Sequence, residues 1–260
     1  MSRTNDDESL EELISRCLID FYQRRKKNLD SLKLGGILRR KNPYLLRALG
    51  IEDPGQLIES MLESFLKEGD ETIFGDSVFE EVAIWAAKKK GGRKSNASRV
   101  DIEIEDDRTI RAYAIKSSPN WGNSTQWAEQ DRAFRELWNR RKGSGKEYDP
   151  VVGACTGTTV SPPTKNRVSR KVSGQVFWEE LTDDSEFYLR FMRCMETKVH
   201  KAKREFELAR EEALVRYKRQ FQESFCKDDG SIDWDMLAQH NSGRSAKKRG
   251  DMVKSLTAFE

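Results

Sequence analysis

Asp101 and Lys116 have the types and spacing that suit phosphodiester hydrolysis. Asp101 opens the stretch DIEIE, in which acidic and apolar residues alternate, and Lys116 closes the stretch RAYAIK. Because the side chains of a strand alternate between its two faces, these stretches predict a β-hairpin around the intervening DDRT. A carboxylate can bind a divalent cation, and a lysine can orient the attacking water or offset the charge of the transition state.

The turn at DDRT fixes the register of this hairpin. It pairs Glu105 with Ile110, which places Asp101 opposite Ala114, and directly opposed residues share a face. One face is therefore expected to hold Asp101, Glu103, Ala114 and Lys116. The other face is apolar and is expected to be buried, with Val100, Ile102, Ile104, Tyr113 and Ile115. The small Ala112 and Ala114 are expected to leave room for a ligand.

A magnesium site suits the first of these faces. Mg²⁺ takes oxygen ligands, usually one or two carboxylates together with water and phosphate. The main-chain carbonyl of Ile115 is a further candidate ligand. The hairpin residues alone leave an alternative open, namely an ordinary amphipathic hairpin with a solvated acidic face.

The segments beside the hairpin favour a site for a polyanion. The basic stretch KKKGGRKSNASR directly precedes Asp101, and the loop KSSPNWGNSTQ after the hairpin contains Pro119 and Trp121. Asn123 is expected to begin a helix, with Gln126 as its capping-box partner. The main-chain amides at such a helix start can meet a phosphate.

The rest of the chain reads as an α/β pattern with abundant helix. Apolar periodicity predicts helices over 8–33, from Pro54 to about residue 66, over 76–89, from Asn123, and over 185–225 with one possible break. Two more strands are expected at PVVGACTG and RVSRKV. We divide the chain into an N-terminal helical region (1–70), a catalytic core (71–182), a C-terminal helical region (183–240) and a polar tail (241–260).

The composition excludes several other kinds of site. The four cysteines are far apart and form no C-x-x-C pair, so they indicate neither a zinc site nor a disulfide framework. Two histidines give little support to a histidine metal cluster or a Ser-His-Asp triad. Without a long apolar run or a signal peptide, the chain is expected to be cytoplasmic. The net charge of +3 conceals basic blocks that suit an anionic partner on one face.

The segment IKSSPNWGNS, residues 115–124, resembles the PD-(D/E)XK superfamily of Type II restriction endonucleases, and most closely its PmeII-type group. KNPYLLRALGIE (41–52), ETIFGD (71–76) and GGRKS (91–95) extend the resemblance over most of 35–160. The resemblance implies a restriction-endonuclease-like α/β core, a mixed central sheet flanked by helices, with extra helices at both ends. It also implies sequence-specific, Mg²⁺-dependent hydrolysis of double-stranded DNA.

Carried over by position, the resemblance makes Asp101 the metal-binding aspartate and Lys116 the catalytic lysine. Ala114 stands where the superfamily carries its second acid. Glu80 is the preferred replacement, as a catalytic and metal-binding residue beside the carbonyl of Ile115. Glu103 is the local alternative, and an inactive or engineered site is the third.

The resemblance further implies a homodimer that cuts both strands at a short site, because a two-fold dimer matches a two-fold site. The dimer contacts, or a surface that wraps DNA, are placed in the helical regions, for which plain helix packing is an equal alternative. A cognate DNA methyltransferase is expected in the same restriction-modification system, but not as a physical partner. The candidate DNA contacts are Arg93, Lys94, Asn96, Asn120, Trp121, Asn123, Lys165, Asn166, Arg167, Arg170 and Lys171.

Two other functions stay open. A catalytically inactive DNA-binding protein with the nuclease fold is favoured by Ala114. A helical interaction protein is suggested by residues 185–225, but it leaves the hairpin and the IKSSPNWGNS loop unexplained.

Overall fold

A computed structural model describes residues 8–196 and 199–243. The contacts among them form two compact units, one with residues 8–21, 73–196 and 199, the other with 22–72 and 200–243. These units combine segments that are distant in the chain. The division expected at residues 70, 182 and 240 follows the order of the chain instead, and it stays a prediction. Residues 244–260 of the expected polar tail lie outside the described residues.

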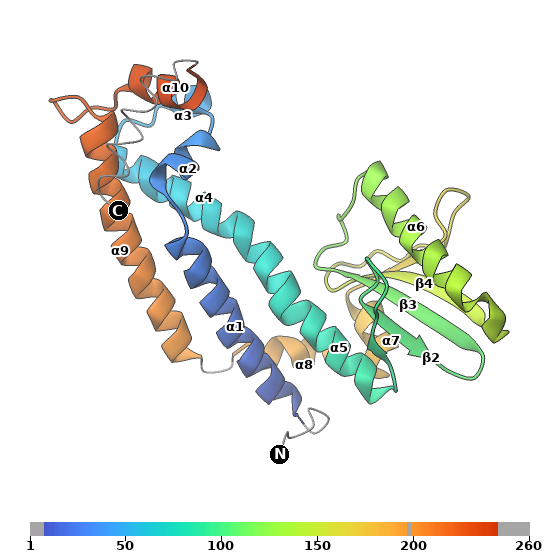
Figure 1. The fold of residues 1–260 in the computed structure, drawn as a ribbon. Coiled ribbons are helices and arrows are strands. Elements are labelled where there is room, and N and C mark those ends of the chain that lie inside the picture. Colours follow the sequence, from blue (N-terminus) through green and yellow to red (C-terminus); the bar gives the residue numbers. More distant parts are fainter. Residues whose placement is uncertain (1–7, 197–198, 244–260) are drawn as a thin grey trace. The chain divides into compact units, whose positions relative to one another are not determined.

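The first unit is built on a mixed five-stranded sheet (Figure 1). Its strands lie in chain order: β1 (Arg93–Lys94), β2 (Ile102–Glu105), β3 (Thr109–Lys116), β4 (Glu147–Ala154) and β5 (Arg170–Ser173). The first three strands are antiparallel, whereas β3, β4 and β5 run parallel. The expected α/β fold with a mixed central sheet is therefore confirmed.

The hairpin has the predicted register over its regular part. Glu103 pairs with Ala112, and Glu105 pairs with Ile110. The ladder ends one residue before the predicted Asp101–Ala114 pair: β2 begins at Ile102, and the Asp101 amide donates to the Tyr113 carbonyl at 2.8 Å. Asp101 therefore lies at the end of the strand, where its side chain is not held to either face by the pleat.

Helices cover both faces of the sheet. On one face, Ile102, Tyr113 and Ile115 pack against apolar residues of α5 (Glu80–Lys89) and α7 (Gln175–Thr182), joined by α8 (Phe187–Cys194) and the first turns of α1 (Leu10–Asp30). On the other face lies α6 (Ser124–Arg141), as Figure 1 shows.

The alanine face of the hairpin is closed rather than open to a ligand. Ala112 and Ala114 have no exposed surface and pack with Phe134 and Leu137 of α6. Their small size lets the helix pack closely on the sheet, so the expected room for a ligand directly over them is wrong. Val100 also packs in this cluster, and its placement on the opposite face is wrong because the ladder ends before it.

The start of α6 forms as predicted. The Asn123 side chain accepts a hydrogen bond from the Gln126 amide, and the Gln126 side chain accepts one from the Asn123 amide, each at 3.0 Å. This reciprocal pair is a capping box, which satisfies two main-chain donors that a helix start leaves open.

The second unit is helical. Besides the later turns of α1, it contains α2 (Leu34–Arg39), α3 (Pro43–Ala48), most of α4 (Pro54–Phe74), α9 (His200–Phe225) and α10 (Trp234–Ser242). Asp53 caps α4, since its Oδ1 accepts from the Gln56 amide at 2.6 Å. The break expected within 185–225 is present between the end of α8 at Cys194 and the start of α9 at His200.

The helix predicted to end near residue 66 continues much further. α4 runs to Phe74 and passes into the π-helical turn η2 (Gly75–Phe79), which leads directly into α5. Of the helices in the described ranges, none is long and apolar enough to cross a membrane.

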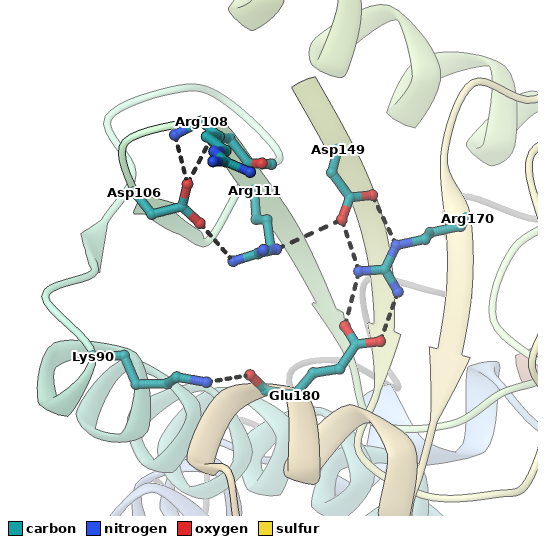
Figure 2. A network of polar contacts seen from close by, with 8 residues as sticks. Lys90, Asp106, Arg108, Arg111, Asp149, Arg170 and Glu180 are labelled. Carbon is teal, nitrogen blue, oxygen red and sulfur yellow. Dashed lines mark hydrogen bonds and ion pairs between the residues drawn. The ribbon is translucent and has the colours of Figure 1, made fainter. Parts of the chain in front are cut away.

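A network of charged side chains ties the amino-terminal ends of β3, β4 and β5 to α7. Figure 2 shows the Arg170 guanidinium between two carboxylates. It binds Asp149 with two hydrogen bonds of 2.8 Å and Glu180 with bonds of 2.7 and 2.9 Å. Arg170 was expected to contact DNA. That expectation stays a prediction; in the structure both edges of its guanidinium are used within the fold.

Arg170→Ala is expected to lower the free energy of unfolding by about 2 kcal/mol, because it leaves two partly buried carboxylates without their shared donor. Arg170→Lys should recover little, since an ammonium cannot form both paired contacts. Urea denaturation followed by circular dichroism measures the loss. Arg111→Ala is the control: its contacts to Asp106 and Asp149, at 3.2 and 3.9 Å, are more exposed and should cost less than about 1 kcal/mol. Equal losses for the two variants would contradict the assignment.

Candidate active site

The candidate site lies at the carboxyl-terminal end of β3, where the antiparallel ladder to β2 has ended. Asp101 Oδ2 accepts a hydrogen bond of 2.6 Å from the Ile115 amide. A side-chain carboxylate thus takes the place of the next main-chain acceptor. In a strand the amide and carbonyl of one residue point to the same edge, so the Ile115 carbonyl lies on the edge that carries Asp101. This placement fits its expected role as an oxygen ligand.

Glu80 reaches this region from the first position of α5, directly after the π-helical turn. The turn passes very close to the residue that follows Lys116: a Cβ added at Gly75 would lie 2.5 Å from Ser117 Oγ. A side chain at Gly75 would therefore force the Ser117 hydroxyl to move. π-helical turns are frequent at functional sites.

Glu80 lies close enough to Asp101 and Lys116 for its charge to affect the pKa of both groups. Burial raises the pKa of Asp101, the Ile115 amide and Lys116 oppose that shift, and the charge of Glu80 adds to it. Burial lowers the pKa of Lys116, with the Asp101 carboxylate opposing and Arg99 adding to the shift. The fold thus brings together the three residues expected to be catalytic.

In this structure the ammonium of Lys94 is paired with the carboxylate of Glu80. Lys94 Nζ donates to Glu80 Oε1 at 2.9 Å, and this pairing is the largest cause that raises the pKa of Lys94. Lys94 was expected to contact DNA. In this state its ammonium is the cation bound to the proposed metal-binding carboxylate.

Glu103 is occupied by the fold. Its side chain is buried and accepts hydrogen bonds from Ser95 Oγ at 2.7 Å, Arg93 Nη2 at 2.9 Å and Arg141 Nη2 at 2.9 Å. With both carboxylate oxygens bound, Glu103 has a structural role, and the structure does not support it as the acid that replaces the one missing at Ala114. Arg93 is correspondingly held at Glu103.

Two carboxylates and one carbonyl are the oxygen donors available to a cation here. The described residues contain no group of three or more histidine, cysteine, aspartate or glutamate side chains arranged to hold a metal ion. Mg²⁺ usually keeps several waters and is bound through one or two carboxylates, so Asp101 and Glu80 with the Ile115 carbonyl fit its chemistry.

The remaining candidate DNA contacts fall into two groups. In the first, the side chains have partners within the fold. Asn123 caps α6, and Trp121 packs against Lys116. Arg167 Nη2 donates to Ser161 Oγ and to the Pro162 carbonyl, each at 2.8 Å, and Lys171 Nζ donates to the Pro119 carbonyl. In the second group the residues are exposed: Asn96, Asn120, Lys165 and Asn166.

Two residues near Lys116 escaped prediction from the sequence. Arg99 has a φ of 60°, in the left-handed region, and the Gln130 amide group donates to its carbonyl at 2.7 Å. An arginine carries no sequence signal for that conformation, which glycine or asparagine would favour. Trp127 packs on Trp121. In the sequence, only the position of the two tryptophans on either side of the helix start at Asn123 pointed to this contact.

The raised pKa of Asp101 predicts the sign of a stability change. Its folded pKa exceeds the unfolded value, so the folded state loses stability as pH rises from below about 3.9 through the raised pKa. Asp101→Asn keeps an acceptor for the Ile115 amide but lacks this loss. The variant should therefore melt at a higher temperature than the parent protein at about pH 8 in EDTA, with the difference shrinking towards about pH 3.

Asp106→Asn is the matched control, with the opposite sign. The Arg108 and Thr109 amides lower the pKa of Asp106, so its charge contributes stability above the usual aspartate pKa. Its loss should lower the melting temperature at alkaline pH. A lower melting temperature for Asp101→Asn at about pH 8 would contradict the burial of its charge.

Comparison with known proteins agrees with this geometry. A family model described as Type II restriction endonuclease EcoO109I matches residues 8–204, which include the whole sheet and every residue of the candidate site. No curated protein matches the chain. The match confirms the expected restriction endonuclease at the level of the family, while the PmeII-type group stays a prediction. The chain belongs to the family of Type II restriction endonuclease EcoO109I.

Proposed function

We propose that this chain is a Mg²⁺-dependent endonuclease of the PD-(D/E)XK superfamily, which hydrolyses phosphodiester bonds in double-stranded DNA at a specific sequence. The observation that carries the proposal is the convergence of Asp101, Glu80 and Lys116 at the end of β3. The family match supports the same reaction.

Asp101, Glu80 and the Ile115 carbonyl would hold the cation. A bound Mg²⁺ would supply Lewis-acid stabilisation of the charge that develops on the phosphate. Asp101 is fixed for this task by its hydrogen bond from the Ile115 amide. To hold a cation, Glu80 would exchange its partner Lys94. Lys94 would then be available for a DNA phosphate, which would couple occupation of the site to contact with the substrate.

Lys116 would act on the attacking water. It follows Ile115 directly and projects beyond the end of the ladder, so its Nζ can hold that water near the scissile phosphate and offset the negative charge of the transition state. Because its pKa is lowered by burial, Lys116 can give up or accept a proton more readily than an exposed lysine.

Substrate contact would come from exposed polar residues around the site. Asn96, Asn120 and Lys165 are exposed, and Lys94 joins them once it leaves Glu80. Cleavage of both strands requires two sites, which a homodimer on a two-fold symmetric sequence provides. Such an enzyme acts in the cytoplasm beside a methyltransferase that protects the host DNA, without a stable complex between the two.

One observation favours a second candidate, a DNA-binding protein of the same fold that does not cut. Ala114 is buried under α6, so β3 supplies no carboxylate to the site. The candidate replacement, Glu80, is paired with Lys94. Specific binding in EDTA without cleavage in Mg²⁺ would decide for this candidate.

The purified protein incubated with unmethylated plasmid and Mg²⁺ should give discrete fragments. Lys116→Ala should reduce the single-turnover rate by at least about 100-fold, because it removes the group that acts on the attacking water. Lys90→Ala is the control. Lys90 donates to the Glu180 carbonyl, as Figure 2 shows, and also to Asp183, so its loss should leave the rate unchanged. A parent protein that cuts no unmethylated DNA would sink the proposal.

Glu80→Gln and Glu103→Gln should separate metal binding from folding. Glu80→Gln should weaken Mn²⁺ affinity by about 10-fold or more in calorimetric titration, because a cation ligand loses its charge, and should slow cleavage at limiting Mg²⁺. Glu103→Gln should leave Mn²⁺ affinity unchanged but lower the free energy of unfolding by about 1–3 kcal/mol, because two arginines lose a charged acceptor. The reverse pattern would assign the metal to Glu103.

A further inference from the structure

We propose that Trp121 is the positioning residue for Lys116, with the face of its indole holding the lysine ammonium at the point where the reaction needs it. The inference rests on the proposed nuclease function. Lys116 Nζ lies 4.6 Å from the centre of the Trp121 ring. Tryptophan is the aromatic side chain that attracts a cation most strongly over its face.

Trp121 is the contact that restrains the end of the Lys116 side chain. In the described part of the chain, Lys116 Nζ forms neither a hydrogen bond nor an ion pair, although Asp101 and Glu80 lie near enough to affect its pKa. A lysine has four rotatable bonds, and a charge at longer range does not fix their angles. The indole supplies both a direction and a surface.

Trp121 is itself held in place by its neighbours in the loop. Its ring packs edge-on against Trp127, with 5.2 Å between ring centres and an angle of 67° between ring planes. Gly122 has a φ of 94°, and a Cβ there would lie 3.0 Å from Trp127 Nε1. A larger residue at Gly122 would therefore strain the backbone and crowd the Trp127 ring.

Two basic residues, one before β5 and one within it, contact the Trp127 ring of this pair. Arg167 lies 5.0 Å from the centre of the Trp127 ring, and it is held in turn by Ser161 Oγ and by the carbonyls of Pro162 and Ser169. Lys171 lies 5.9 Å from the same ring and donates to the Pro119 carbonyl. The line of contacts runs from these two residues through Trp127 and Trp121 to Lys116.

The test compares Trp121→Leu with Trp121→Phe. Leucine fills part of the space but has no ring face, whereas phenylalanine keeps one. Trp121→Leu should slow single-turnover cleavage on the order of tenfold, and Trp121→Phe should recover most of that rate. The dissociation constant for DNA, measured with Ca²⁺ in place of Mg²⁺, should change less than about twofold in both variants, since the change lies in the placement of Lys116.

Trp85→Leu is the matched control. Trp85 also lies beside a lysine, with Lys89 Nζ 5.5 Å from its ring, but its indole donates to the Glu8 carbonyl and has no contact with Lys116 among the described residues. Its loss should leave the cleavage rate of the folded protein unchanged. A tenfold slowing in this variant as well would mean that any lost tryptophan slows the enzyme, and would overturn the specific role of Trp121.

A second measurement does not depend on cleavage. The ring current of Trp121 should shift the ε-methylene protons of Lys116 upfield in spectra of the full protein labelled with ¹³C-lysine, with assignment by Lys116→Arg. The shift should vanish in Trp121→Leu and persist in Trp121→Phe.

The outcomes separate the two proposals. If the parent protein cuts and Lys116→Ala does not, while Trp121→Leu cuts at the parent rate, the positioning role is wrong and the nuclease function stands. Weakened DNA binding with an unchanged single-turnover rate would likewise overturn positioning and make Trp121 a substrate contact. A parent protein that cuts no DNA overturns the nuclease function, and the role of Trp121 with it.

Discussion

The hydrogen bond from the Ile115 amide to Asp101 Oδ2 is the interaction on which the candidate site depends. It ends the ladder between β2 and β3 by putting a carboxylate where a main-chain carbonyl would otherwise accept. Because a side chain accepts here in place of the main chain, the Ile115 carbonyl lies beside an acidic group. Lys116, the last residue of β3, lies beyond the part of that strand that pairs with β2. One short contact therefore lies where the β2–β3 ladder ends and next to three chemically distinct groups. Glu80 approaches from a different element, α5, whereas position 114 on β3 carries an alanine.

The site is placed at a cost to the folded state. Burial favours the neutral forms of both Asp101 and Lys116, so each charge is held against its solvation. The surrounding structure offsets this cost with contacts that have no part in the chemistry. These include the apolar packing of α6 over the alanines and the two arginines bound by Glu103. Perturbed pKa values of this kind cluster at functional sites.

Local sequence signals predicted the local structure well. The pairing of Glu103 with Ala112 followed from the turn alone, and the Asn123–Gln126 capping box followed from a four-residue pattern. The features that local signals missed came from contacts between residues far apart in the chain. Burial of Ala114 depends on Phe134, and the role of Arg170 depends on Asp149 and Glu180, none of which a residue's own neighbours reveal. The hairpin pattern pointed to Asp101 and Lys116, family resemblance added Glu80, and the fold brings the three residues close together.

The π-helical turn at Gly75–Phe79 makes the site depend on chain length as well as on residue type. An α-helix advances about 100° per residue. Removing one residue from this turn would regularise the helix and swing Glu80 about a quarter of a revolution around its axis. The position of Glu80 thus depends on the extra residue in the π-helical turn, whereas the positions of Asp101 and Lys116 depend on the hairpin. Descendants of this chain can exchange almost any surface residue near the turn more easily than they can lose one.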